Sequence, residues 1–213
     1  VFRYAIEMEY ATVNPFAHVK RKSTPQRKVV WTEDDVRQFL DTAYSTFEWR
    51  SIGLIVHMAY EWAQRVGDMR LLTWNNLDLD EQRLDLEQSK RRADVHLPIS
   101  DALCKMLVQQ HTDFGFQPYV APRPEPYNGA YTSYHSTDIH KLVNEVKDSA
   151  GLPKELTALD LRRTGITEMV EAGVDTLGIM QVSGHSNPQS VKPYLVNTLK
   201  GARTALNKRN NDK

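Results

Sequence analysis

Apolar residues recur every three or four positions through most of this chain, which is the period of an amphipathic helix. The longest stripe follows residue 50 and comprises Ile52, Ile55, Val56, Ala59, Trp62, Ala63 and Val66. Residues 84–86 and 95–99 instead alternate apolar and polar side chains, with a basic turn between them. Alternation with a period of two is typical of β-strands. The pattern therefore predicts a mainly α fold with a small antiparallel β-sheet, an α+β architecture.

Capping residues set the expected helix boundaries. Thr32 and Thr157 each precede an acidic residue by three positions, as N-terminal capping boxes do. Three glycines are expected to end later helices: Gly151, Gly173 and Gly184. The segment 117–134, rich in proline and tyrosine, is expected to form a loop. A helix is expected over residues 1–13, ended by Asn14-Pro15, another from about residue 51, and a short one over 68–74.

Two adjacent arginines stand out in the helix expected from Thr157. The helical period assigns four residues to its buried stripe: Leu159, Ile166, Met169 and Val170. Arg162 and Arg163 then fall at the edges of that stripe, where they are costly unless an anion meets them. The alternative is that one arginine pairs with an acid such as Asp160 and the other reaches solvent.

Composition excludes several classes of protein. Of the 213 residues, 40% are hydrophobic and 25% charged, which argues against disordered, collagen-like and membrane proteins. No apolar run approaches the roughly 18 residues of a membrane helix, and no segment resembles a signal peptide. The single cysteine, Cys104, forms neither an intrachain disulfide nor a cysteine zinc cluster, and a reducing compartment fits.

The net charge of zero conceals a pattern along the chain. Residues 1–30 carry six basic and two acidic side chains, a net of +4, and residues 199–213 carry five and one, again +4. The middle of the chain, 31–198, therefore carries −8. Basic ends on an acidic body suggest contact with a polyanion, and the alternative is that they are solubilising tails.

Four further residues carry little information when each is taken alone. Arg65 lies where a helix breaks, and its simplest role is a local ion pair with Asp68. Lys90 lies in the expected hairpin, where lysines are commonly exposed. His185 lies in a tight turn, and Tyr194 follows it by nine residues. Their order along the chain is more specific than any one of them.

That order, with Arg162, resembles the catalytic domain of the tyrosine recombinases, the phage integrase family. Three segments carry the resemblance: Ala63 to Trp74 (AQRVGDMRLLTW), Leu159 to Thr164 (LDLRRT) and Val182 to Ser186 (VSGHS). The resemblance implies five catalytic residues: Arg65, Lys90, Arg162, His185 and Tyr194. It further implies that residues 1–28 are the end of a truncated core-binding domain and a basic linker, 29–198 the catalytic domain, and 199–213 a basic C-terminal tail.

The resemblance also implies a function. We expect a site-specific recombinase that cleaves and rejoins DNA through a 3′-phosphotyrosine, needs no metal, ATP or other cofactor, and integrates or excises a phage or mobile element. Its expected partners are double-stranded DNA attachment sites, three further copies in a homotetramer, and accessory DNA-bending proteins, with no membrane, in the cytoplasm of a bacterial host. Six basic residues are expected to contact DNA: Lys20, Arg21, Lys22, Arg91, Arg92 and Arg163.

Two positions depart from the family pattern. Leu159 stands where the family usually has a histidine, and Ser183 stands where it usually has a leucine. We expect the first to remove a proton-handling group, whose assistance His185 or a water takes over, and the second to alter packing only. Three other functions stay open: a type IB topoisomerase-like strand transferase, a DNA-binding module with impaired catalysis, and a helical protein-interaction domain.

Overall fold

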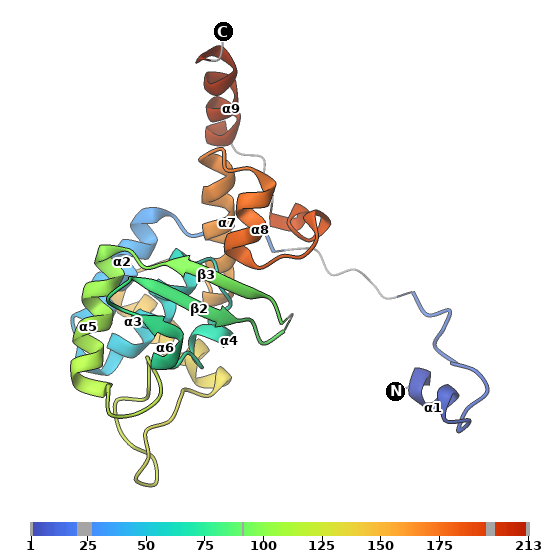
Figure 1. Ribbon diagram of the computed structural model, residues 1–213, viewed down its shortest axis with the longest axis horizontal. Helices are drawn as coiled ribbons and strands as arrows, with labels where there is room; N and C mark the ends of the chain where they lie inside the picture. The colour runs from blue at the N-terminus through green and yellow to red at the C-terminus, as the bar shows by residue number, and fades with distance from the viewer. Residues whose placement is uncertain (1, 21–26, 91, 195–198, 212–213) are drawn as a thin grey trace.

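The computed structural model of the chain describes residues 2–20, 27–90, 92–194 and 199–211. Its body is built from the longer helices, with a three-stranded sheet beside them (Figure 1). The helices of the body are α2 (Glu33–Tyr44), α3 (Phe47–Glu61), α4 (Val66–Met69), α5 (Asp101–Phe114), α6 (Ser136–Ala150), α7 (Leu161–Glu171) and α8 (Thr176–Ser183). A short helix, α1 (Phe2–Glu7), lies apart from this body, and α9 (Leu199–Asn211) projects from it (Figure 1).

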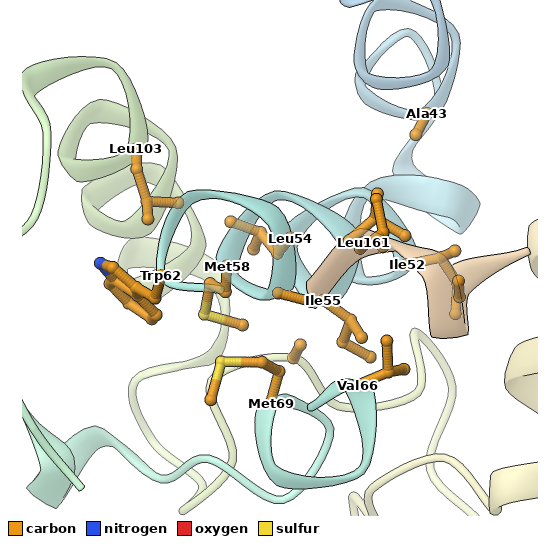
Figure 2. Close-up of a cluster of buried hydrophobic side chains, with 14 of the residues drawn as sticks. Ala43, Ile52, Leu54, Ile55, Met58, Trp62, Val66, Met69, Leu103 and Leu161 are labelled. Atoms are coloured by element: carbon orange, nitrogen blue, oxygen red, sulfur yellow. The ribbon is translucent and has the colours of Figure 1, made fainter. Parts of the chain in front are cut away.

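Helix α3 forms the centre of the core. Its side chains Ile52, Leu54, Ile55 and Met58 are fully buried. Figure 2 shows residues of α2, α4, α5 and α7 packed around them, represented by Ala43, Met69, Leu103 and Leu161. All seven residues of the apolar stripe recognised in the sequence are buried. The core therefore holds α4, which Arg65 precedes, and α7, which carries Arg162.

The sheet is antiparallel with strand order β1–β2–β3, as the alternating pattern predicted. Its strands are β1 (Leu77–Asp78), β2 (Arg83–Glu87) and β3 (Asp94–Pro98). The register sets Leu84 opposite Leu97, and both side chains are buried against the helices. The β2–β3 turn extends beyond the sheet, and Lys90 lies in it.

The C-terminal third consists of short elements joined by tight turns. A 3₁₀ turn, η2 (Ala158–Asp160), leads into α7, and Gly184 ends α8 with a φ of +67°. Two further 3₁₀ turns follow, η3 (Pro188–Ser190) and η4 (Lys192–Tyr194), and a last one, η1 (Trp74–Asn76), precedes β1. Within the described ranges, none of the helices is long and apolar enough to cross a bilayer.

Three expectations about the elements were wrong in part. The first helix ends at Glu7, well before Asn14-Pro15, because the chain turns at Glu9, which has a φ of +59°. Helix α3 begins earlier than expected, because Thr46 rather than a residue near 51 accepts the capping bond. The short helix expected over 68–74 is α4, at Val66–Met69.

The buried stripe of the helix expected from Thr157 was also partly wrong. Leu159 is 69% exposed, whereas Leu161 and Ile166 are fully buried, and Met169 and Val170 are half-buried. The reason is the 3₁₀ turn η2, which has three residues per turn rather than 3.6. A period of 3.6 residues counted from Thr157 therefore assigns Leu159 to the buried face, although its side chain is exposed.

Candidate active site

Arg65 lies at the turn between α3 and α4. Ala63 adopts the left-handed conformation, with a φ of +48°, and the chain reverses there. Arg65 follows as the N-cap of α4. Its Nη1 donates to Oε1 of Gln88 at 3.2 Å and lies 3.6 Å from Oδ2 of Asp68. The expected Arg65–Asp68 pair is therefore present, and Arg65 also contacts the end of the hairpin strand.

Two buried glutamines join the three segments of the site. Gln88 and Gln64 are fully buried, and Gln88 Nε2 donates to Oε1 of Gln64 and to the Ser183 carbonyl at 2.9 Å. Gln64 in turn donates to the carbonyls of Trp62 and Val182. Because buried amides need partners, this network fixes the hairpin, the α3–α4 turn and the end of α8 together. Neither glutamine was predicted from the sequence.

The hairpin is tied down next to Lys90. The Ser89 hydroxyl donates to Oδ1 of Asp68 at 2.5 Å, and the Ser89 amide lies 3.4 Å from the same oxygen. Asp68 thus contacts both Arg65 and the residue before Lys90. The Lys90 side chain is exposed, and it faces the same cleft as Arg65.

Arg162 lies in the first turn of α7 and is buried, with 6% exposure. A close approach of α7 to α3 brings it there: a Cβ at Gly165 would lie only 2.8 Å from the Tyr60 carbonyl oxygen. Arg162 Nη1 donates to the Ala63 carbonyl at 3.1 Å, and Nη2 donates to the Ser183 carbonyl at 2.7 Å. Arg162 therefore lies beneath the cleft, joined to the other two segments of the site.

The surroundings of Arg162 disfavour its charged form. Burial, and then the positive charge of Arg65, lower the pKa of Arg162 to about 10, while Tyr194 and Asp68 act to raise it. The two guanidinium groups are thus close enough to repel each other. An anion between them would relieve that repulsion, which is the condition set by the sequence analysis for buried arginines.

The rings of His185 and Tyr194 lie next to each other, and both residues line the cleft. Their ring centroids are 5.4 Å apart, and His185 is buried with 5% exposure. The Arg163 guanidinium carbon lies 5.2 Å from the Tyr194 ring centroid, and Arg163 Nη1 donates to the Pro193 carbonyl at 2.7 Å. The Thr167 hydroxyl donates to the Tyr194 carbonyl oxygen at 3.3 Å. Tyr194 is thus held by α7, although it is separated from it in sequence.

Arg27 is a further cationic residue of the site, which the sequence analysis counted only as part of the basic linker. Its Nε donates to both carboxylate oxygens of Asp160, at 2.9 and 3.0 Å. Asp160 therefore pairs with Arg27, and the alternative in which it pairs with Arg162 or Arg163 was wrong. The Trp31 amide also binds Thr164 on α7, so the end of the linker docks beside Arg162. No periodic signal marks Arg27 in the sequence.

Together these residues enclose a cleft of about 440 Å³. Its lining consists of Arg27, Arg65, Lys90, Arg163, His185, Ser190, Pro193 and Tyr194. Four of these described lining residues are cationic and none is acidic. A concave surface of one charge concentrates counter-ions, so the cleft suits a phosphate group. The ranges that the structure covers contain no cluster of three or more His, Cys, Asp or Glu side chains able to hold a metal ion.

Of the other residues expected to contact DNA, the two that the structure describes do not line the cleft. Lys20 is exposed in the N-terminal segment, and Arg92 is exposed in an ion pair with Glu87 at 2.9 Å, outside the cleft lining. Arg21, Lys22 and Arg91 lie outside the described residues. Leu159, at the position where the family usually has a histidine, is exposed and does not line the cleft.

Comparisons with known proteins identify the family and the fold of the chain. The model of the phage integrase family matches residues 30–200. Tyrosine recombinase XerC of Pediococcus pentosaceus is 19% identical over 202 residues, which cover 91% of this chain and 66% of that protein. A tyrosine recombinase of Pseudothermotoga lettingae is 23% identical over 143 residues, covering 67% of this chain and 48% of the other. The chain thus spans about half to two thirds of these curated relatives.

Solved structures share the fold. The crystal structure of XerA recombinase matches with a TM-score of 0.69 and 20% identity, over 91% of this chain and 68% of that one. A lambda integrase tetramer bound to a Holliday junction matches with a TM-score of 0.67 and 18% identity, over 94% and 56%. The Tn1549 transposon integrase in complex with a circular intermediate DNA matches with a TM-score of 0.68 and 18% identity, over 97% and 75%.

Proposed function

Since this chain belongs to the phage integrase family, we propose that it is the catalytic part of a site-specific tyrosine recombinase that cleaves and rejoins DNA through a 3′-phosphotyrosine. One observation carries this proposal. Tyr194 lies in a cationic cleft with its ring 5.4 Å from that of His185, and Arg65 and Lys90 line the same cleft.

The cleft has the charge that a phosphodiester requires. The two non-bridging oxygens of a DNA phosphate repel nucleophiles and gain charge in the transition state. Arg65 presents planar paired donors at the cleft wall, and Arg162 adds a buried positive charge beneath it. Preorganised donors of this kind contribute roughly 3–4 kcal/mol each. That Arg162 contacts the phosphate oxygens itself stays a prediction.

Tyr194 is the proposed nucleophile. A phenol with a reference pKa of about 10 is a weak nucleophile at neutral pH, and nearby positive charge favours the phenolate. Arg163 lies over the Tyr194 ring, and Arg162 lies close enough for the two groups to interact electrostatically. Tyr194 thus lies beside Arg162, one of the two cations proposed to bind the phosphate.

Lys90 is the proposed general acid. The leaving 5′ oxygen needs a proton, and the Lys90 ammonium faces the cleft from the hairpin that Ser89 ties to Asp68. The attack exchanges one phosphodiester for another, so the bond energy is kept and the strand is rejoined without ATP. Covalent catalysis divides the reaction into two reversible steps.

The proposed substrate is duplex DNA bearing attachment sites, and the proposed assembly is a homotetramer. A lambda integrase of the same fold has been crystallised as a tetramer on a Holliday junction. We propose that residues 1–28 end a core-binding domain and linker, that 29–198 form the catalytic domain, and that 199–213 form a basic tail. Integration or excision of a phage or other mobile element in a bacterial cytoplasm, assisted by DNA-bending proteins, is the proposed setting.

A two-site assay tests this function. The full-length protein is incubated with a plasmid that carries two copies of its attachment site, and with a supercoiled plasmid that carries none. A recombinase exchanges the strands of the first plasmid and leaves the second supercoiled. Relaxation of the second plasmid without recombination of the first would instead establish a topoisomerase-like strand transferase.

A further inference from the structure

The Ser183 hydroxyl makes two short contacts in the interior of the site. Ser183 is the last residue of α8 and is fully buried. Its Oγ lies 2.5 Å from the Ile179 carbonyl oxygen and 2.7 Å from Nδ1 of His185. Its carbonyl oxygen accepts bonds from Arg162 and Gln88, so the residue is held from both sides.

These two contacts determine where the hydrogens lie. A serine hydroxyl has one hydrogen, and a carbonyl oxygen has none. The 2.5 Å contact between Ser183 Oγ and the Ile179 oxygen therefore requires the serine hydrogen between them. Ser183 Oγ then offers only lone pairs to His185, so Nδ1 of His185 must donate the hydrogen in the 2.7 Å bond.

The guanidinium of Arg162 lies against the same ring and bears on its charge. Arg162 Nη2 lies 3.3 Å from Nε2 and 3.4 Å from Nδ1 of His185. A guanidinium has donors and no acceptor, so its positive charge beside the ring favours the neutral imidazole over the imidazolium, while the Ser183 contact alone selects the nitrogen that carries the hydrogen. The hydrogen bond made by one ring nitrogen thus decides the chemistry of the other.

We propose that Ser183 is a positioning residue, which holds the neutral His185 ring as the Nδ1–H tautomer and makes Nε2 the nitrogen that accepts a proton. The geometry stands by itself, and its use in catalysis rests on the proposed function. Ser183 was expected to alter packing only. Its hydroxyl instead sets the direction of proton transfer at His185.

The tautomer assigns each proton in the cleavage step. The Tyr194 O–H bond breaks, its proton moves to Nε2 of His185, and the phenolate oxygen forms a bond to phosphorus. The bond from phosphorus to the 5′ oxygen breaks, its electron pair stays on that oxygen, and the oxygen takes a proton from Lys90. His185, now an imidazolium, donates from Nε2 to a phosphate oxygen, and rejoining reverses each transfer.

Nitrogen NMR tests this assignment without DNA. The protonated nitrogen of a neutral imidazole resonates far from the nitrogen that carries the lone pair, so ¹⁵N spectra of the full-length protein identify the tautomer. Spectra are recorded at a pH where the ring is neutral, and His185→Gln identifies the signal. We expect hydrogen on Nδ1 in the wild type, and a shift to hydrogen on Nε2 in Ser183→Ala.

Matched variants separate positioning from folding. Ser183→Thr keeps the hydroxyl and is expected to retain the Nδ1–H form, and so is Ser186→Ala, which removes an exposed hydroxyl beside His185. Ser183→Ala is expected to slow formation of the covalent DNA adduct by about 10²-fold, the low end of the contribution of a general base, with unchanged DNA affinity, and Ser183→Thr is expected to restore the rate.

Each outcome has one meaning. Hydrogen on Nε2 in the wild type, or an unchanged tautomer and rate in Ser183→Ala, would overturn the role of Ser183 and leave the proposed function standing. Hydrogen on Nδ1, moved by Ser183→Ala, in a protein that forms no adduct would support the role of Ser183 in fixing the ring and overturn the proposed function.

Discussion

Arg27 donates through Nε to both carboxylate oxygens of Asp160, across 133 positions of the chain. Asp160 is buried, and it also accepts hydrogen bonds from the amide and the hydroxyl of Thr157, the N-cap residue of η2. The contact therefore places a linker arginine at the start of the segment that carries Arg162. It also leaves part of the Arg27 side chain exposed toward the cleft.

Arg27→Ala is expected to weaken binding to duplex DNA for all sequences alike. One lost phosphate contact should lower the slope of log affinity against log salt by about 1. Arg37→Ala is a suitable control, because it removes the same charge from an exposed pair with Asp34 outside the cleft. Equal slopes for the two variants, measured by fluorescence anisotropy, would remove Arg27 from the DNA contact.

Lys90→Ala is expected to slow cleavage of ordinary DNA by about 10²- to 10⁴-fold, the usual contribution of a general acid. A 5′-thio leaving group departs without a proton, so the same variant should cleave that substrate at nearly the wild-type rate. Single-turnover rates on the two substrates measure the difference. Equal slowing on both would exclude Lys90 as the acid.

Gly184→Ala is expected to destabilise the protein more than Gly151→Ala does. Both glycines have a φ of +67°, where any other residue costs about 1–2 kcal/mol. A Cβ at Gly184 would also lie 2.6 Å from Nε2 of Gln88, whereas nothing lies within 4 Å at Gly151. Crowding of this kind adds about 1–3 kcal/mol. Urea unfolding measures the free energy of unfolding of each variant. Equal losses of this free energy would contradict the prediction and show that Gln88 moves aside.

Sulfate is expected to stabilise the folded protein by binding where Arg65 and Arg162 repel each other. The pKa of Arg162 falls only to about 10, so Arg162 is charged at pH 7. An anion at 100 times its dissociation constant adds about 2.7 kcal/mol to the free energy of unfolding. Sulfate should raise the melting temperature of Arg65→Gln much less than that of the wild type. The comparison separates binding at the site from general salt effects, which act on both proteins. A rise of the same size in both proteins would contradict the site.

The features predicted well from the sequence are those fixed by neighbouring residues. The capping box at Thr32, the ends of α6 and α8 and the antiparallel hairpin depend on contacts within a few positions. The order of the proposed catalytic residues was recognised as a family pattern, and the structure brings Arg65, Lys90, His185 and Tyr194 to one cleft.

The features that were missed depend on contacts between distant segments. Gln64 and Gln88 look like ordinary polar residues until the hairpin packs on α8, and Arg27 looks like part of a solvated linker until it meets Asp160. Leu159 was assigned to the core because a 3₁₀ turn cannot be distinguished from a helical turn by periodicity. The role of the Ser183 hydroxyl depends on the position of the His185 ring, which no spacing specifies.

The covalent DNA adduct tests the central claim most directly. A duplex with a nick beside the cleavage site loses its short fragment after attack and traps the intermediate on the full-length protein. We predict that peptide mapping of the trapped adduct identifies Tyr194, and that Tyr194→Phe forms none while binding the same DNA equally well. An adduct on another residue, or undiminished recombination by Tyr194→Phe, would contradict the account.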